Sequence, residues 1–397
     1  MRFNFSTPTI DSLYVLSLAG FAHAWFRLQC TDPLVSERID PIVSPGVVGS
    51  NHVHTVHGAS NFNSTYDYDD IRASDCTSCM VTQDKSNYWF PKLYYMYPNG
   101  TFQAVGNGGL LVYYQNRGTQ DVANGGPGLK AFPPGLKMIT GDPTRRAKKF
   151  PAGQGSQDEL AERAIQWTCL RYTVNQPQYD DNGTGFPTTD CEAGFQSRLH
   201  MPACWDGVNL DSSDHKSHTA FLSGLDNGDC PSSHPVGLMK LFFEVTWSVT
   251  DFAHLWNPGK DKWPFVWSTG DPTGFSWHGD FQTGWETSAL QNAIDHCNNP
   301  NDATGQGDAS ACSFLTLQSA STANQCKVSS IVSEDVQGPM ARLPGCNPIQ
   351  SGPGDATLFG NDDCPASLSV SSDGLRRVAS RNGALGLLAS AAITFIV

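Results

Sequence analysis

The stretch Leu238-Met-Lys-Leu-Phe-Phe-Glu-Val-Thr-Trp247 carries the clearest strand signal in the chain. It is long, aromatic and β-branched, which is typical of a strand in the core of a β-sandwich. Shorter runs of the same kind recur on both sides of it and are bounded by Gly, Pro, Asn and Asp. We therefore predict a mostly β protein with a β-sandwich or jelly-roll-like core and few short helices. The predicted strands span residues 25–30, 52–57, 88–97, 101–105, 110–115, 136–139, 165–172, 238–249, 265–268 and 275–281.

Helical spacing of apolar residues occurs in two places. Leu290, Ala293, Ile294 and Cys297 recur at positions i, i+3, i+4 and i+7, which predicts a helix after Trp285. A shorter helix is expected over about residues 157–165.

The composition of the 397-residue chain excludes several classes of protein. Charged residues make up only 16%, and there are 10 Trp, 11 Tyr and 21 Phe, which is unlike a disordered chain or a coiled coil. The net charge of −13 repels phosphate backbones. We therefore predict no nucleic-acid partner, and we expect a neutral or cationic ligand rather than a polyanion.

Both ends of the chain resemble processing signals. An early Arg2, an apolar run from Leu13 to Phe21 and the small-residue pattern Ala22-His23-Ala24 predict a signal peptide over residues 1–24. Cleavage after Ala22 instead would expose an amino-terminal histidine, which is a copper ligand. Small residues near Ser372, a polar spacer and an uncharged tail predict a glycolipid-anchor signal over residues 371–397, with Ser372 as the attachment site. The alternatives are a weak tail anchor or an apolar end with no role. The prediction is an extracellular, cell-surface protein held to the membrane by a glycolipid.

Cysteine usage agrees with export. All 12 Cys lie between Cys30 and Cys364, and an even count in an exported chain predicts up to six disulfides. Cys76-x-x-Cys79 is also the pattern of a redox or zinc pair, but structural disulfides are favoured. We divide the chain into a core domain over residues 25–298 and a Ser/Gly-rich, disulfide-held extension over residues 299–370. Three glycosylation sequons, which predict surface loops, begin at Asn63, Asn99 and Asn182.

The residues that carry chemistry gather in three segments. In the first, His52 and His54 point to the same face of a strand because side chains alternate, and His57 lies near the strand end. Imidazoles placed in this way bind a metal ion or donate hydrogen bonds to a sugar.

The second and third segments bring carboxylates, imidazoles and indoles together. The second holds Trp205, Asp206, Asp211, Asp214, His215, Lys216 and His218 in a Gly- and Ser-containing loop. The third holds Trp277, His278, Asp280 and Trp285, in which the two indoles are expected to form a stacking surface for a sugar ring. The alternative is a structural one, in which Asp211 and Asp214 cap turns, Trp205 belongs to the core and the histidines form internal polar networks.

The same segments resemble a known family. The motifs are Cys204-Trp-Asp-Gly207, Asp214-His-Lys-Ser-His218, His234-Pro-Val236, His278-Gly-Asp-Phe281 and Gly284-Trp285, with Arg27-Leu-Gln-Cys30, Asp40-Pro-Ile-Val43, His52-x-His54 and Tyr88-Trp-x-Pro91 before them. They resemble a secreted family of fungi and actinobacteria that is catalogued as a domain of unknown function, number nineteen ninety-six. The resemblance covers roughly residues 25–300. It implies an extracellular protein of biomass-degrading or cell-wall secretomes and supplies no reaction.

Three functions fit these residues. The first is a glycoside hydrolase-like enzyme that acts on a cell-wall or biomass polysaccharide and has no cofactor. Its predicted catalytic residues are Asp206, Asp211, Asp214, His215, His218, His278 and Asp280, and its predicted substrate-binding residues are His52, His54, Lys216, Trp205, Trp277 and Trp285. The second is a zinc- or copper-dependent enzyme, whose ligands are His52, His54 and one of His57, His218 or His278. The third is a non-catalytic glycan-binding protein of the cell wall.

Overall fold

The computed structural model describes residues 24–172, 182–258, 260–297 and 307–359. The predicted signal peptide, apart from Ala24, and the predicted glycolipid-anchor signal lie outside the described residues. No helix among the described residues combines the length and the apolar composition that a membrane crossing needs.

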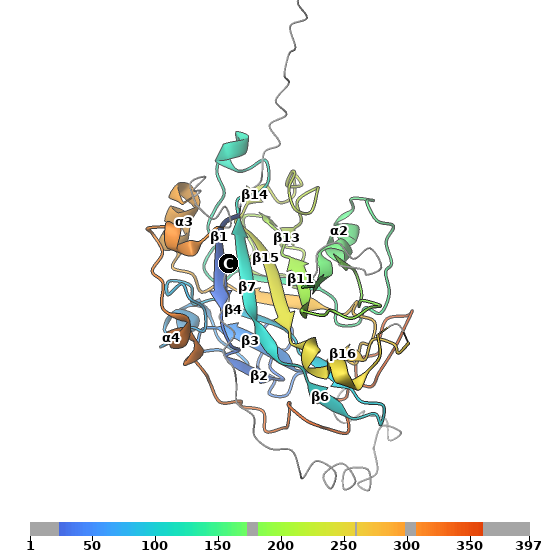
Figure 1. Cartoon of the computed structure of the whole chain (residues 1–397). Coiled ribbons are helices and arrows are strands. Elements are labelled where there is room, and N and C mark those ends of the chain that lie inside the picture. The colour runs from blue at the N-terminus through green and yellow to red at the C-terminus, as the bar shows by residue number, and fades with distance from the viewer. Residues whose placement is uncertain (1–23, 173–181, 259, 298–306, 360–397) are drawn as a thin grey trace, which may run out of the picture.

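Two antiparallel sheets form the sandwich that the sequence predicts (Figure 1). The six-stranded sheet has the order β1-β7-β15-β11-β9-β10, and the five-stranded sheet has the order β2-β3-β4-β17-β8. The strands of the first sheet are β1 (Ala24–Cys30), β7 (Asn107–Gln115), β9 (Ile165–Leu170), β10 (Asn182–Gly183), β11 (Gly194–His200) and β15 (Lys240–Trp247). Those of the second are β2 (Val35–Glu37), β3 (His54–Gly58), β4 (Asn87–Pro91), β8 (Lys137–Gly141) and β17 (His278–Gln282).

The core between the sheets follows from the alternation of side chains along the strands. On β15, Leu241, Phe243, Val245 and Trp247 are fully buried, and each large apolar side chain contributes about 1.5–3 kcal/mol when it leaves water. The ring of Tyr88 from the opposite sheet lies 5.6 Å from that of Phe243. The strand signal at residues 238–247 therefore marks a central strand of the sandwich.

Smaller elements surround the sandwich. The predicted strand over residues 88–97 breaks at Lys92 into β4 and β5, which belong to different sheets. Both predicted helices are present, as α2 and α3. A three-stranded sheet holds β5 (Leu93–Met96), β6 (Phe102–Ala104) and β16 (Phe265–Trp267), and another holds β12 (Cys204–Trp205), β13 (Thr219–Ala220) and β14 (Val236–Gly237). The helices are α1 (Tyr68–Arg72), α2 (Gln157–Arg163), α3 (Thr287–His296), α4 (Ala320–Asn324) and the 3₁₀ segments η1 (Val122–Asn124), η2 (Val249–Leu255) and η3 (Ala309–Ala311).

Residues 307–359 wrap around the sandwich, as predicted for a disulfide-held extension. Val328 and Val332 of this segment pack on the outer face of the five-stranded sheet, against a cluster that contains Val56 and Trp89. The disulfides are Cys30–Cys79, Cys76–Cys326, Cys169–Cys191, Cys204–Cys230 and Cys297–Cys312, and Cys346 is also disulfide-bonded. Because Cys76 and Cys79 belong to different disulfides, they form neither a redox pair nor a zinc pair.

Candidate functional site

Two of the three predicted clusters meet on the outer face of the five-stranded sheet. His54 lies in β3 and His278 in β17, and β4 runs between these strands. His54 is paired with Pro91 of β4, and the register between β4 and β17, extended by two residues, places His278 opposite the same proline. His52 lies just before β3. The register therefore brings His54 and His278 to the two sides of Pro91 on one face of the sheet.

The three imidazoles are in mutual contact. Their ring centroids are 4.3 Å apart for His52 and His54, 4.9 Å for His52 and His278, and 5.8 Å for His54 and His278. One ligand nitrogen from each ring lies within 4.8 Å of the other two. His54 is fully buried, whereas His278 and His52 are 3% and 5% exposed, so solvent approaches the cluster from the side of these two residues.

Backbone carbonyls fix the orientation of two of the rings. The Nδ1 atom of His54 lies 3.0 Å from the carbonyl oxygen of Ile39, and that of His278 lies 2.8 Å from the carbonyl oxygen of Ser276. A carbonyl oxygen only accepts, so each Nδ1 carries the hydrogen and donates it. In the neutral ring, the Nε2 atom then presents a lone pair. The Nε2 atoms of His52 and His278 are 3.1 Å apart, and Nε2 of His54 is buried without a hydrogen-bond partner.

Burial keeps these rings uncharged. Desolvation lowers the pKa of His54 and of His278 to about 4, and the charge of His54 also acts on His278. Desolvation, with the charges of both neighbouring imidazoles, lowers the pKa of His52 well below 6.5. At neutral pH the cluster therefore presents neutral imidazoles, the form in which histidine binds metals.

Buried oxygen-bearing side chains surround the imidazoles. On β17, Asp280 and Gln282 lie on the same face as His278 because side chains alternate. Oδ2 of Asp280, Oε1 of Gln282 and the hydroxyl of Tyr66 are all buried without a hydrogen-bond partner. Asp40 is held by the backbone N–H groups of residues 42 and 43. Burial raises the pKa of both carboxyl groups, which favours their uncharged forms.

The carboxylates of the second cluster act as turn acceptors. Asp206 accepts hydrogen bonds from the backbone N–H groups of Val208 and Asn209 at 2.8 and 2.9 Å. Oδ1 of Asp214 accepts hydrogen bonds from both hydroxyls and both backbone N–H groups that surround it, those of Ser212, Lys216 and Ser217. Burial acts in the opposite direction, but these hydrogen bonds lower the pKa of Asp214. The turn-capping alternative, which concerns Asp211 and Asp214, therefore describes Asp214, and Asp206 is engaged in the same way.

The remaining polar residues of the same loop are also engaged. Nδ1 of His215 lies 2.8 Å from Oδ1 of Asp211, and Nζ of Lys137 lies 3.6 Å from Oδ2 of the same carboxylate. His218 is buried and donates from Nε2 to the carbonyl oxygen of Lys137 at 2.7 Å. These contacts fix the loop on β8, and they keep His218 out of the imidazole cluster.

The predicted sugar-stacking surface of Trp277 and Trp285 is wrong. Both indoles are buried in the core, at 1% and 0% exposure. Their Nε1 atoms donate to the carbonyl oxygen of Arg198 and to the hydroxyl of Tyr114. Trp205 is half-buried and donates to the carbonyl oxygen of Asn209 at 2.6 Å. Trp277 and Trp285 therefore present no free ring face to a polysaccharide.

His57 does not join His52 and His54. It stands three positions after His54 on the same strand, and this odd offset turns it to the opposite face. Its ring stacks on that of Phe90, with centroids 5.6 Å apart. The third imidazole beside His52 and His54 is therefore that of His278 and not that of His57.

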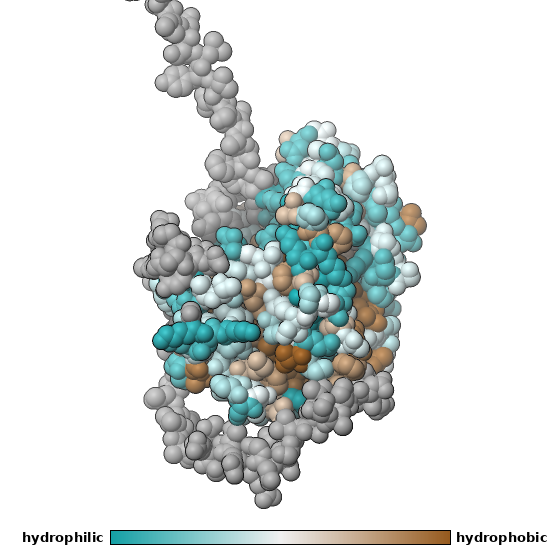
Figure 2. Space-filling model, turned by 90° about the vertical axis from the view of Figure 1, so that its right-hand side faces the viewer, coloured by the Kyte–Doolittle hydropathy of each residue, from teal (hydrophilic) through white to brown (hydrophobic). Residues whose placement is uncertain are grey.

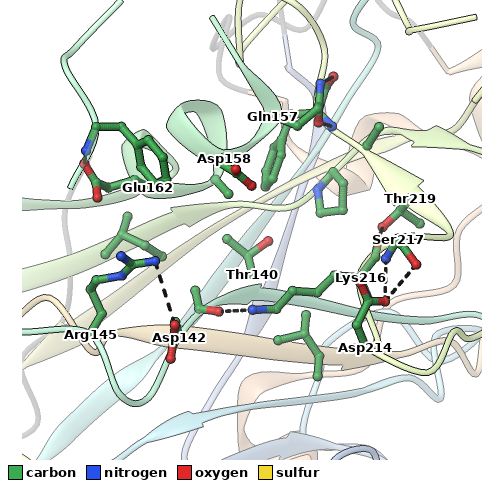
Figure 3. A pocket seen from close by; sticks show the side chains of 18 of the residues that line it. Thr140, Asp142, Arg145, Gln157, Asp158, Glu162, Asp214, Lys216, Ser217 and Thr219 are labelled. Atoms are coloured by element: carbon green, nitrogen blue, oxygen red, sulfur yellow. Dashed lines mark hydrogen bonds and ion pairs between the residues drawn. The ribbon is translucent and has the colours of Figure 1, made fainter. Parts of the chain in front are cut away.

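A cavity of about 640 Å³ lies beside the second cluster (Figure 3). Its walls come from α2, the end of β8 and the loops that follow residues 141, 213 and 230. Lys216 lies across one wall, and its Nζ donates to the carbonyl oxygen of Gly141 at 2.7 Å. Gly141 is paired with His278, so only β8 separates this wall from the strand that carries the imidazole.

Several residues of the cavity wall were not predicted from the sequence. Asp142, Arg145, Asp158 and Glu162 line the cavity. They lie in charged segments that lack histidine, aromatic clusters or a spacing typical of a site. Only the helical pattern near residue 157 marked one of these segments as structured.

Comparison with protein families gives one match. The family described as "Domain of unknown function (DUF1996)" matches residues 40–285, which contain all three clusters and the whole lining of the cavity. No curated protein and no solved structure matches the chain.

Proposed function

Because the chain belongs to the DUF1996 family, whose description names no activity, we propose from the structure that it is an extracellular carbohydrate-active protein. The cavity binds a segment of a cell-wall or biomass polysaccharide. The observation that carries this proposal is the cavity of about 640 Å³, which is within the range of ligand sites and opens next to the loop of the second cluster.

The lining of the cavity supports a ligand rich in hydroxyl groups. Phe150, Phe221 and Phe275 supply aromatic surface for the C–H faces of sugar rings. Asp158 and Lys216 lie on different walls and supply an acceptor and a donor (Figure 3). In the described part of the chain, the Asp158 carboxylate has no hydrogen-bond or ion-pair partner of its own. A hydroxyl group that binds it displaces only water.

Charge supports a ligand that is not strongly anionic. The wall carries acidic and basic side chains in similar numbers, and the whole chain has a net charge of −13. A polyanion would meet unfavourable fields outside the cavity and no excess of cations inside it. The side of the molecule that bears α2 is mainly hydrophilic, with apolar residues in small groups (Figure 2), so the ligand is bound in the cavity rather than on a broad apolar platform.

Extracellular location is the setting of this proposal. The disulfides need an oxidising compartment, and the sequon residues Asn63, Asn99 and Asn182 are all exposed. We propose that the mature protein carries N-linked glycans and is held at the cell surface by a glycolipid on Ser372. Release from cells by a phosphatidylinositol-specific phospholipase tests the anchor, and retention after treatment contradicts it.

A non-catalytic glycan-binding protein is the second candidate. It is favoured by the turn-capping hydrogen bonds of Asp206 and Asp214, which occupy two of the carboxylates expected to act as acid or base. Release of reducing ends from the bound polysaccharide separates an enzyme from a binding protein.

Calorimetric titration with neutral β-glucan fragments and with cationic chitosan fragments tests the cavity. We expect Asp158→Asn to weaken binding of one of these ligands by about tenfold, since a charged hydrogen bond contributes about 1.5–3 kcal/mol. Asp251→Asn is the matched control, because Asp251 is also an exposed acid in the first turn of a helix but lies outside the cavity. Equal affinity of both variants for every fragment that binds would contradict the proposal.

A further inference from the structure

We propose that His52, His54 and His278 bind one transition-metal ion, Zn²⁺ or Cu²⁺, through their imidazole nitrogens. This goes beyond the proposed function, because metal binding at these residues does not depend on what the cavity binds. The sequence left three candidates for the third ligand, His57, His218 and His278, and the structure favours His278.

The spacing of the nitrogens fits a shared ion. A tetrahedral Zn²⁺ ion with Zn–N bonds of about 2.0–2.1 Å holds two nitrogen ligands about 3.4 Å apart. The Nε2 atoms of His52 and His278 are already 3.1 Å apart, and the largest separation among the three ligand nitrogens is within 4.8 Å. Small rotations of the side chains therefore bring all three nitrogens to one centre.

The protein holds two of the ligands in the required tautomer. His54 and His278 each donate Nδ1–H to a backbone carbonyl, of Ile39 and of Ser276. This arrangement behind metal-bound histidines orients the ring and directs the Nε2 lone pair at the ion. The acceptors are main-chain atoms, so the orientation is set by the fold and not by a further side chain.

The imidazole cluster contains a buried polar atom that lacks a partner. Nε2 of His54 is buried and has no hydrogen bond, although buried polar atoms are nearly always paired. An ion bound to it removes this deficit. Oδ2 of Asp280, which lies on the same face of β17 as His278, is also buried and unpartnered.

The donor set selects the class of metal. Imidazole nitrogens favour zinc, copper and related ions, whereas Mg²⁺ and Ca²⁺ favour oxygen ligands. Three protein ligands leave a coordination position for water or a substrate, as catalytic zinc sites do. His52 and His278 are 5% and 3% exposed and His54 is fully buried, so the site is almost enclosed by the described residues.

Metal binding by the full chain tests the proposal without any glycan. The chain is purified from a secretory host, stripped with a chelator and titrated with Zn²⁺, Cu²⁺ or Co²⁺ alone. We expect about one ion per chain. We expect His54→Gln and His278→Gln to weaken binding more than about 100-fold, since loss of the hydrogen bond behind a ligand already costs about 10- to 100-fold.

His57→Gln is the matched control. His57 is as fully buried as His54 and lies on the same strand, but it faces the opposite side of the sheet. His57→Gln buries an amide as His54→Gln does, so the two variants should lose similar stability. His57→Gln should nevertheless keep the metal affinity of the wild type. Loss of the metal in His57→Gln to the same extent as in His54→Gln would overturn the proposal, as would a stripped wild-type chain that binds none of the three ions.

If the variants do not fold, a measurement on the wild-type chain still tests the proposal. X-ray absorption of the loaded chain should give three imidazole nitrogens around the ion, and fewer than three overturns the assignment. Asp158→Asn, which alters the cavity, should bind the metal as the wild type does. Failure of glycan binding and failure of metal binding are therefore separate results.

Discussion

The imidazole of His57 stacks on the ring of Phe90, with centroids 5.6 Å apart and an angle of 27° between the ring planes. Phe90 belongs to the core between the two sheets, so His57 is a histidine enclosed in apolar surroundings. Desolvation, together with the charge of Lys327 from the C-terminal wrap, lowers the pKa of His57 to about 3, although the backbone carbonyl of Thr31, as an acceptor for the ring N–H, acts in the opposite direction.

This burial makes His57 a source of acid sensitivity. Its pKa is about 6.5 in the unfolded chain and about 3 in the folded chain, so protons bind the unfolded state first. The resulting loss of stability begins as the pH falls below about 6.5 and is complete only below about 3. By pH 5 it amounts to about 2 kcal/mol for this residue.

We therefore expect His57→Phe to lose about 2 kcal/mol less than the wild type between pH 7 and pH 5. The measurement is the free energy of unfolding by urea at both pH values, with chelator present. Asp40 and Asp280, whose raised pKa values have the opposite effect on stability, are common to both proteins and cancel in the comparison. Identical pH dependence of the two proteins would mean that His57 is not buried in the neutral form.

Gly141 couples the cavity wall to the imidazole cluster. It has a φ of +97° and is paired with His278, and a Cβ at this position would lie 2.5 Å from the carbonyl oxygen of Trp277 and 2.7 Å from Cα of His278. Both are backbone atoms, so a side-chain rotation cannot relieve the clash and β17 must move. We expect Gly141→Ala to destabilise the protein by several kcal/mol and to weaken metal binding.

Gly125→Ala is the control for the backbone angle alone. Gly125 has a φ of +83°, and nothing lies within 4 Å of its ideal Cβ. Its substitution should cost only the strain of a left-handed residue, about 1–2 kcal/mol, and should leave metal binding unchanged. Denaturant unfolding and metal titration measure both effects. If the two variants behave alike, the clash at Gly141 has no consequence for His278.

Much of the sandwich is predictable from local pattern. The buried apolar residues Leu241, Phe243, Val245 and Trp247 occupy alternate positions of β15, and the aromatic and β-branched types of this strand identify it without knowledge of its neighbours. By contrast, β11 lies at the centre of the same sheet and was not predicted. Its inward residues Phe195 and Leu199 are separated by Gln196 and Arg198, so short sequence windows contain little apolar character.

The imidazole cluster is only half predictable. Alternation along a strand places His52 and His54 together from sequence alone. Their meeting with His278 depends on the register of β3 and β17 against β4, and specifically on Pro91 between them, which no local pattern contains. The burial of Trp277 and Trp285 was missed for a related reason. Both faces of the five-stranded sheet are covered, so polar and aromatic residues alternate there without marking an exposed side.

The disulfide between Cys76 and Cys326 holds the C-terminal wrap against the outer face of the five-stranded sheet. It spans 250 residues, and a cross-link over a long loop restricts the unfolded chain strongly. We expect the double variant Cys76→Ser, Cys326→Ser to lose about 2–5 kcal/mol of unfolding free energy. We also expect faster proteolysis within residues 319–336, with denaturation and mass spectrometry as the measurements. The control is the double variant Cys169→Ser, Cys191→Ser, which removes a disulfide with a sequence separation of only 22 residues. It should leave the wrap resistant to proteolysis.

Asp214 decides between a structural and a catalytic role for the second cluster. All four hydrogen bonds that it receives end on Oδ1, two from the hydroxyls of Ser212 and Ser217 and two from backbone N–H groups. An asparagine carries an acceptor oxygen at the same position. We therefore expect Asp214→Asn to preserve the loop, the cavity wall at Lys216 and the affinity for polysaccharide. Asp214→Ala should open the loop and weaken that affinity.

The rate of polysaccharide turnover by Asp214→Asn tests whether the carboxylate is a general acid or base. In that case the variant would bind the polysaccharide but turn it over slowly. Loss of such a group costs about 10²- to 10⁴-fold in rate, while binding is retained. Burial acts to raise the pKa of Asp214, but the hydrogen bonds outweigh it and lower the pKa, which favours the ionised carboxylate over a general acid. The expected outcome is turnover close to that of the wild type in Asp214→Asn. Binding at wild-type affinity with turnover reduced a hundredfold would restore Asp214 as a catalytic residue.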